Sequence, residues 1–228
     1  MNNLSLVVFD MDGTLIDSQD VIIEAMRRAF IRMDRPAPTD GQTRGIIGLS
    51  LQQAVATIAP DMTHAEAVAG AEFYRQSFIE MRAEMGGDGA TPMYPGARAA
   101  LNRLHSQDNI LMGVATGKAR RGLDHAYESH GIGHYFVTHQ TADEHPSKPH
   151  PSMLHQTLLD TGVEVQRAVM VGDTEFDMAM GKAAGFATVG VSWGYHSQER
   201  LSAAKPDAII DSFDDLDEAL TYIWRGLA

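Results

Sequence analysis

The sequence contains no cysteine, and this absence excludes several classes of protein at once. A chain without thiols has no disulfide scaffold, no thiolate zinc site, no iron–sulfur cluster and no cysteine nucleophile. Basic residues are also scarce, because 18 lysines and arginines stand against 30 aspartates and glutamates, for a net charge of −12. An acidic chain has no long-range attraction for nucleic acid or anionic membranes. We therefore expect neither as a partner.

Long apolar runs are missing as well. No segment approaches the roughly 18 residues that a membrane span requires, and residues 1–5 lack the positive charge of a signal peptide. We therefore expect a cytoplasmic protein. A hydrophobic fraction of 44% is still ample for a core, and 228 residues suit one large domain or one domain with an insertion. The composition leaves both a monomer and a homodimer open.

Short apolar runs rich in β-branched residues alternate with helical patterns along most of the chain. This alternation predicts an α/β fold with a doubly wound, Rossmann-like, mainly parallel sheet that has helices on both faces. Ligands of such sheets bind at the carboxyl ends of the strands. The predicted strands are 4–9, 110–115, 135–138, 168–171, 188–191 and 208–210, and the predicted helices between them are 97–106, 120–129, 153–160 and 177–184.

Residues 18–89 interrupt this alternation. They contain no comparable β-branched run but show helical periodicity, with an apolar stripe from Val21 to Met33 and further helices predicted over 50–58, 64–71 and 71–85. We interpret this stretch as a helical cap domain, 18–89, inserted into an α/β core domain made of 1–17 and 90–228.

A pair of acids follows the first predicted strand, in the run Asp10-Met11-Asp12-Gly13-Thr14. Two carboxylates two residues apart in an extended chain project to the same side. Because they repel each other, one tends to stay ionised while the other holds a proton more readily, which suits a nucleophile and an acid/base. Gly13 permits a sharp turn, and Thr14 can hydrogen-bond locally. The alternative is a turn with two solvated acids.

A second acidic strand end repeats this design. Asp173 follows a buried run, and Asp177 lies one helical turn further on the same face. Four carboxylates that meet at neighbouring strand ends require a cation, and hard oxygen ligands favour Mg²⁺. The alternative is a helix start in which Asp173 is the N-cap and Asp177 is solvated.

Two more strand ends carry groups that suit a phosphate. Thr116-Gly117-Lys118 offers a hydroxyl and backbone N–H groups, and Lys148 is held between Ser147 and Pro149. For each of these, taken singly, a solvated surface loop is the alternative.

Together these residues resemble the haloacid dehalogenase superfamily. Asp10 to Leu15, Thr116, Lys148 before Pro149, and Gly172-Asp173-Thr174 with Asp177 are similar to its four motifs, in order. The helical insertion resembles the small cap of the phosphoglycolate phosphatase-like branch, so the resemblance covers nearly the whole chain.

The resemblance implies a role for each matching residue. Asp10 would attack phosphorus to form an aspartyl-phosphate, and Asp12 would act as the acid and base. Asp10, the main-chain carbonyl of Asp12 and Asp173 would hold Mg²⁺, with Asp177 in support. The transferring phosphoryl group would be bound by Thr116, Gly13 and Gly117, and its charge neutralised by Lys148.

The expected function is therefore Mg²⁺-dependent hydrolysis of a small phosphorylated metabolite. Asp12 favours a phosphoester substrate, because a dehalogenase needs no proton at this position. A phosphosugar mutase with the same aspartate pair and a non-catalytic phosphate-sensing protein remain open. Substrate choice would fall to the cap, where Arg44, Ile47, Gly48 and Leu49 form a candidate lip. Arg44 could there bind a second anionic group of the substrate.

Overall fold

The computed structural model describes residues 4–84 and 91–225. A six-stranded sheet in the order β3-β2-β1-β4-β5-β6 runs through its centre, and every paired neighbour is parallel. The α/β doubly wound fold class is thereby confirmed. The strands are β1 (Ser5–Phe9), β2 (Ile110–Thr116), β3 (Thr138–Thr141), β4 (Ala168–Gly172), β5 (Ala187–Val191) and β6 (Ala208–Ile210).

Strand β1 lies in the interior of the sheet. All five of its residues are buried, and it pairs with β2 on one side and β4 on the other. Alternate side chains enter different clusters, since Val7 and Phe9 join one apolar core whereas Leu6 and Val8 join another. This two-sided burial is the reason that the strand is a continuous apolar run.

Helices cover both faces of the sheet. The first cluster draws on α5, α6 and α10, and the second on α7 and α8. The core helices are α5 (Ala97–His105), α6 (Arg120–His130), α7 (Ser152–Thr161), α8 (Glu175–Ala184), α9 (Gln198–Ala203) and α10 (Leu216–Trp224), with 3₁₀ helices η2 (Gly133–Tyr135), η3 (Val165–Arg167) and η4 (Phe213–Asp215).

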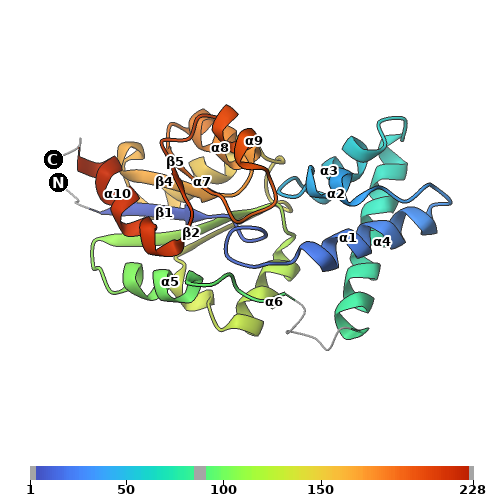
Figure 1. Cartoon of the computed structure of the whole chain (residues 1–228), viewed down its shortest axis with the longest axis horizontal. Coiled ribbons are helices and arrows are strands. Elements are labelled where there is room, and N and C mark those ends of the chain that lie inside the picture. The colour runs from blue at the N-terminus through green and yellow to red at the C-terminus, as the bar shows by residue number, and fades with distance from the viewer. Residues whose placement is uncertain (1–3, 85–90, 226–228) are drawn as a thin grey trace.

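Among the described residues between β1 and α5, four helices form a separate layer at the end of the molecule opposite α10 (Figure 1). Helix α1 packs along α4, and both contribute to a third apolar cluster that includes Met26, Phe30 and Ala67. The four are α1 (Gln19–Arg32), α2 (Asp40–Arg44), α3 (Leu51–Ile58) and α4 (His64–Glu84). The predicted cap boundary at 89/90 lies outside the described residues.

Local predictions differ from the structure in three places. The strand predicted at 135–138 is wrong. Tyr135 ends the 3₁₀ helix η2 and packs with Phe136 in the first apolar cluster, and β3 begins only at Thr138. Strand β3 is polar because it is an edge strand. The two helices predicted over 64–85 are the single helix α4, and α2, α9 and α10 were not predicted.

Membrane insertion finds no support in the helices. Within residues 4–84 and 91–225, none is both long enough and apolar enough to cross a bilayer.

Candidate active site

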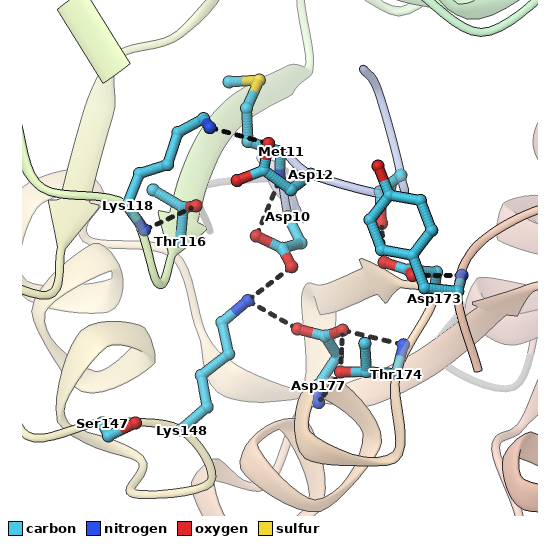
Figure 2. A network of polar contacts seen from close by, with 12 residues as sticks. Asp10, Met11, Asp12, Thr116, Lys118, Ser147, Lys148, Asp173, Thr174 and Asp177 are labelled. Atoms are coloured by element: carbon cyan, nitrogen blue, oxygen red, sulfur yellow. Dashed lines mark hydrogen bonds and ion pairs between the residues drawn. The ribbon is translucent and has the colours of Figure 1, made fainter. Parts of the chain in front are cut away.

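The candidate site lies at the carboxyl ends of the three central strands. Asp10 follows β1, Thr116 ends β2, and Asp173 follows β4. The strand order reverses between β1 and β4, and the chain leaves the sheet in opposite directions there, which opens a crevice. Parallel pairing brings these strand ends side by side, although 163 residue numbers separate Asp10 from Asp173 (Figure 2).

Three carboxylates are buried together in this crevice. Asp10, Asp173 and Asp177 each offer an oxygen, and these oxygens all lie within 4.8 Å of one another. Nζ of Lys148 lies 2.9 Å from Oδ2 of Asp10 and 2.6 Å from Oδ1 of Asp177. Oδ2 of Asp10 still lacks an aligned hydrogen bond among the described residues. One ammonium does not balance three carboxylates, so the cluster fits a divalent cation as its missing partner.

The pKa values of these groups reflect the crowding. Burial raises the pKa of Asp10 to about 7, the charge of Lys148 opposes this rise, and the charge of Asp177 adds to it. Burial, followed by the charges of Asp177 and Asp10, also raises the pKa of Asp173. Burial disfavours the charged form of Lys148, but the neighbouring carboxylates prevail and raise its pKa, so it stays an ammonium.

Hydrogen bonds hold Asp173 in place from two sides. Oγ1 of Thr14 donates to Oδ1 at 3.0 Å, and the backbone N–H of Tyr195 donates to Oδ2 at 2.9 Å. Thr14 therefore does not form the predicted local hydrogen bond but donates to the residue that follows the neighbouring strand β4. Nor is Asp173 the cap of a helix, because Thr174 is the N-cap of α8.

Both carboxylate oxygens of Asp177 have partners within the chain. Its Oδ2 accepts the Oγ1–H of Thr174 at 2.6 Å and the backbone N–H of Thr174 at 3.0 Å, while Oδ1 faces Lys148. It is buried, so the alternative of a solvated acid does not hold.

The side chain of Asp12 lies apart from the three buried acids. Nζ of Lys118 is 2.7 Å from its Oδ1, and Oγ of Ser18 donates to the same oxygen. Among the described residues no hydrogen bond or ion pair involves Oδ2, so this oxygen can interact with a ligand. Gly13 follows with φ of +83°, a conformation that allows the turn after Asp12 and that other residues rarely adopt.

A cleft of about 750 Å³ opens above these groups. Asp10, Asp12, Thr116 and Gly117 contribute to its lining on the core side, and Ile47, Gly48 and Leu49 do so on the cap side. Arg44 is not among the lining residues, and its Nε donates to Oε1 of Gln19 at 3.0 Å. Its predicted contact with a second anionic group has no support in this placement.

The cap segment approaches the strand end closely at Gly117. A Cβ at this position would lie 2.6 Å from the carbonyl oxygen of Leu49 and 2.7 Å from that of Gly48. Only a residue without a side chain therefore lets the segment lie against the end of β2. A further link joins the cap to the Lys148 loop, because the backbone N–H of Ser50 donates to Oγ of Ser147 at 2.8 Å.

Three contacts of the site were not foreseen from the sequence. The sequence indicates Lys118 only as a neighbour of Thr116, and it indicates no role in the site for Ser18, the first residue of the predicted cap. Tyr195 joins them, because its Oη accepts the backbone N–H of Ser18 at 2.8 Å while its own N–H holds Asp173. The only sequence signal for Lys118 was its position two residues after a strand-end threonine.

We predict that Gly117→Ala lowers the free energy of unfolding by about 1–3 kcal/mol, because two carbonyl oxygens must move to admit the methyl group. Urea denaturation measures this. Gly122→Ala on α6 is the matched control, since its Cβ would meet only side-chain carbons of Lys118 at 3.9 Å or more. The control should be neutral or stabilising by up to about 1 kcal/mol. Equal stability of Gly117→Ala and the wild type would show that the cap segment does not contact Gly117.

Comparison with known proteins agrees with this geometry. Residues 7–191 match the family model described as haloacid dehalogenase-like hydrolase. The chain is 34% identical to a probable phosphatase IndB of Dickeya dadantii, over 92% of this chain and 91% of that one. It is 30% identical to a phosphoglycolate phosphatase of Vibrio parahaemolyticus, with 96% of each chain covered.

Solved structures show the same fold. The crystal structure of a predicted phosphatase from Clostridium acetobutylicum superposes with a TM-score of 0.84 at 22% identity, and 96% of this chain and 99% of that chain are covered. The expected resemblance is confirmed by a family match over most of the chain. The chain belongs to the haloacid dehalogenase-like hydrolases.

Proposed function

We propose that this hydrolase is a Mg²⁺-dependent phosphatase that cleaves small phosphate monoesters, phosphoglycolate-like or sugar phosphates, through an aspartyl-phosphate on Asp10. The observation that carries the proposal is the buried Asp10 carboxylate, paired with Lys148 and followed two residues later by Asp12 with a free oxygen. The names of the relatives, a probable phosphatase and a phosphoglycolate phosphatase, support the same reaction class.

The metal would be held by Asp10, Asp173 and the main-chain carbonyl of Asp12. All are hard oxygen donors, which Mg²⁺ prefers, and the buried cluster carries more negative charge than Lys148 neutralises. Bound Mg²⁺ would supply positive charge to the phosphoryl oxygens. Asp177 uses both of its oxygens on Lys148 and Thr174, so we assign it to positioning Lys148.

In the first step an oxygen of Asp10 forms a bond to phosphorus as the bond from phosphorus to the leaving oxygen breaks. Asp12 donates a proton from Oδ2 to that leaving oxygen. Lys148 offsets part of the negative charge between the carboxylate and the phosphoryl group, while Thr116 and the backbone around Gly117 bind the phosphoryl oxygens.

In the second step water attacks the phosphorus of the aspartyl-phosphate. Asp12, now ionised, takes a proton from this water, so inorganic phosphate leaves and Asp10 is regenerated. Ser18 and Lys118 hold Oδ1 of Asp12, which leaves Oδ2 for both proton transfers. One side chain thus serves as acid and then as base.

We predict that Asp10→Asn lowers the release of phosphate from p-nitrophenyl phosphate by at least about 10⁴-fold, because the amide is not a competent nucleophile. A coupled phosphate assay with Mg²⁺ present measures this. The variant should fold normally, since it removes a charge from a buried site. Glu199→Gln, an exposed change on α9, is the control and should keep wild-type turnover. Residual activity above about 1% would reject Asp10 as the nucleophile.

A second prediction concerns stability, Mg²⁺ and pH. Without the metal, the raised pKa of Asp10 means that the fold prefers the protonated carboxyl group. Its contribution to stability is fully present below the ordinary pKa of 3.8 and is lost as pH rises through about 7. Mg²⁺ binds the ionised form, so the rise in Tm that it causes should increase between about pH 5 and about pH 8.

Differential scanning calorimetry with and without Mg²⁺ tests this. Asp173→Asn should lose most of the Mg²⁺-induced rise in Tm, whereas Glu199→Gln should retain it. A rise that is equal at both pH values, or that survives in Asp173→Asn, would place the metal elsewhere.

A further inference from the structure

The cleft is much larger than the smallest substrate considered above. Phosphoglycolate has about nine non-hydrogen atoms, which fill roughly 270 Å³ at the ~30 Å³ that one water occupies in the liquid. The cleft measures about 750 Å³. A two-carbon ester seated on Asp10 would leave most of it to solvent.

The cap side of the cleft combines charged residues of α4, namely Glu72, Arg75 and Arg82, with an apolar part. Ile22 and Met26 of α1, Ile47, and Tyr74 and Phe78 of α4 line it, and they belong to or pack against one cluster. The rings of Tyr74 and Phe78 are 5.9 Å apart with an interplanar angle of 32°. An apolar surface of this kind suits the carbon face of a ring or a chain.

This aromatic pair adjoins the acid/base residue. The Phe78 ring centroid lies 5.5 Å from Nζ of Lys118, and the same ammonium is 2.7 Å from Oδ1 of Asp12 (Figure 2 shows this ion pair). Burial and the charge of Asp12 both raise the pKa of Tyr74, so its hydroxyl keeps its proton. Tyr74, whose ring centroid is 5.9 Å from that of Phe78, therefore lies on the Asp12 side of the cleft.

The Tyr74 hydroxyl makes no hydrogen bond within residues 4–84 and 91–225, although the side chain is partly buried in the cleft wall. Tyr195, also near the site, has its hydroxyl hydrogen-bonded to Ser18. The hydroxyl is open to the cleft, so a ligand bound there can accept a hydrogen bond from it.

We propose that Tyr74 is a substrate-binding residue that donates a hydrogen bond to a hydroxyl of the leaving group, and that the preferred substrates are phosphate esters of sugar-sized or larger hydroxylated bodies. This inference rests on the proposed phosphatase activity and narrows its substrate class. A sugar combines hydroxyl groups for Tyr74 with an apolar ring face for Phe78.

The test compares four esters on the full-length wild-type protein with Mg²⁺: ribose 5-phosphate, glucose 6-phosphate, phosphoglycolate and p-nitrophenyl phosphate. We expect kcat/KM for at least one of the sugar phosphates to exceed that for phosphoglycolate by about tenfold or more. A higher kcat/KM for phosphoglycolate than for both sugar phosphates overturns the inference while the phosphatase activity stands. Failure to hydrolyse any of the four, p-nitrophenyl phosphate included, rejects the proposed function itself.

Tyr74→Phe tests the hydrogen bond. Loss of one neutral hydrogen bond corresponds to about a 3- to 12-fold fall in kcat/KM for the preferred sugar phosphate. The fall should be smaller for p-nitrophenyl phosphate, whose leaving group offers no neighbouring hydroxyl. Tyr222→Phe on α10, where the side chain is 69% exposed, is the matched control and should change neither substrate. An equal fall for both esters in Tyr74→Phe would mean a structural role and would reject the assignment.

Discussion

Three buried carboxylates facing a single lysine are the constraint on which the rest of this structure depends. Asp10, Asp173 and Asp177 would repel each other in any fold that brought them together without compensation. Lys148 supplies part of the compensation through contacts of 2.9 Å and 2.6 Å. The remainder falls to hydrogen bonds from distant parts of the chain and, in our proposal, to Mg²⁺.

The parallel sheet makes this crowding possible. Buried strands β1 and β4 end side by side and deliver Asp10 and Asp173 to the same edge. The N-terminal turn of α8 then adds Asp177, held by Thr174. Because hydrophobic burial of the strands stabilises the whole sheet, it can offset the electrostatic cost of crowding a few acids at the carboxyl ends of these strands.

The cap is tied to the same cluster by short polar links. Tyr195 connects Ser18, just before α1, to Asp173, and Ser50, just before α3, hydrogen-bonds Ser147 beside Lys148. Movement of the cap would therefore be transmitted to residues next to the acids.

How far the sequence predicts this site depends on where each contact originates. The sequence predicts four of the site residues together, because a strand end is a local pattern and the carboxyl ends of parallel strands lie at the same side of a sheet. These residues are Asp10, Thr116, Lys148 and Asp173. The contact between Ser18 and Tyr195 was not predicted, since 177 positions separate the two residues in the chain and only folding brings them together. Tyr74 was not predicted either, because the sequence does not show which residues of α4 line the cleft. The positive charge of Arg44 suggested a ligand for a second anionic group, but its guanidinium donates a hydrogen bond to Gln19 instead. Strand β3 was misplaced for a related reason, because an edge strand needs no apolar run.

The most direct test of the account is to trap the phosphoryl group on Asp10. In Asp12→Asn, p-nitrophenyl phosphate should still phosphorylate Asp10, because its leaving group needs no proton, but water attack should be slow without a base. Rapid acid quench followed by peptide mass spectrometry should then find close to one phosphoryl group per chain on the Asp10 peptide, and none in Asp10→Asn. Release of p-nitrophenol by Asp12→Asn with no phosphoryl group on Asp10 would contradict the account.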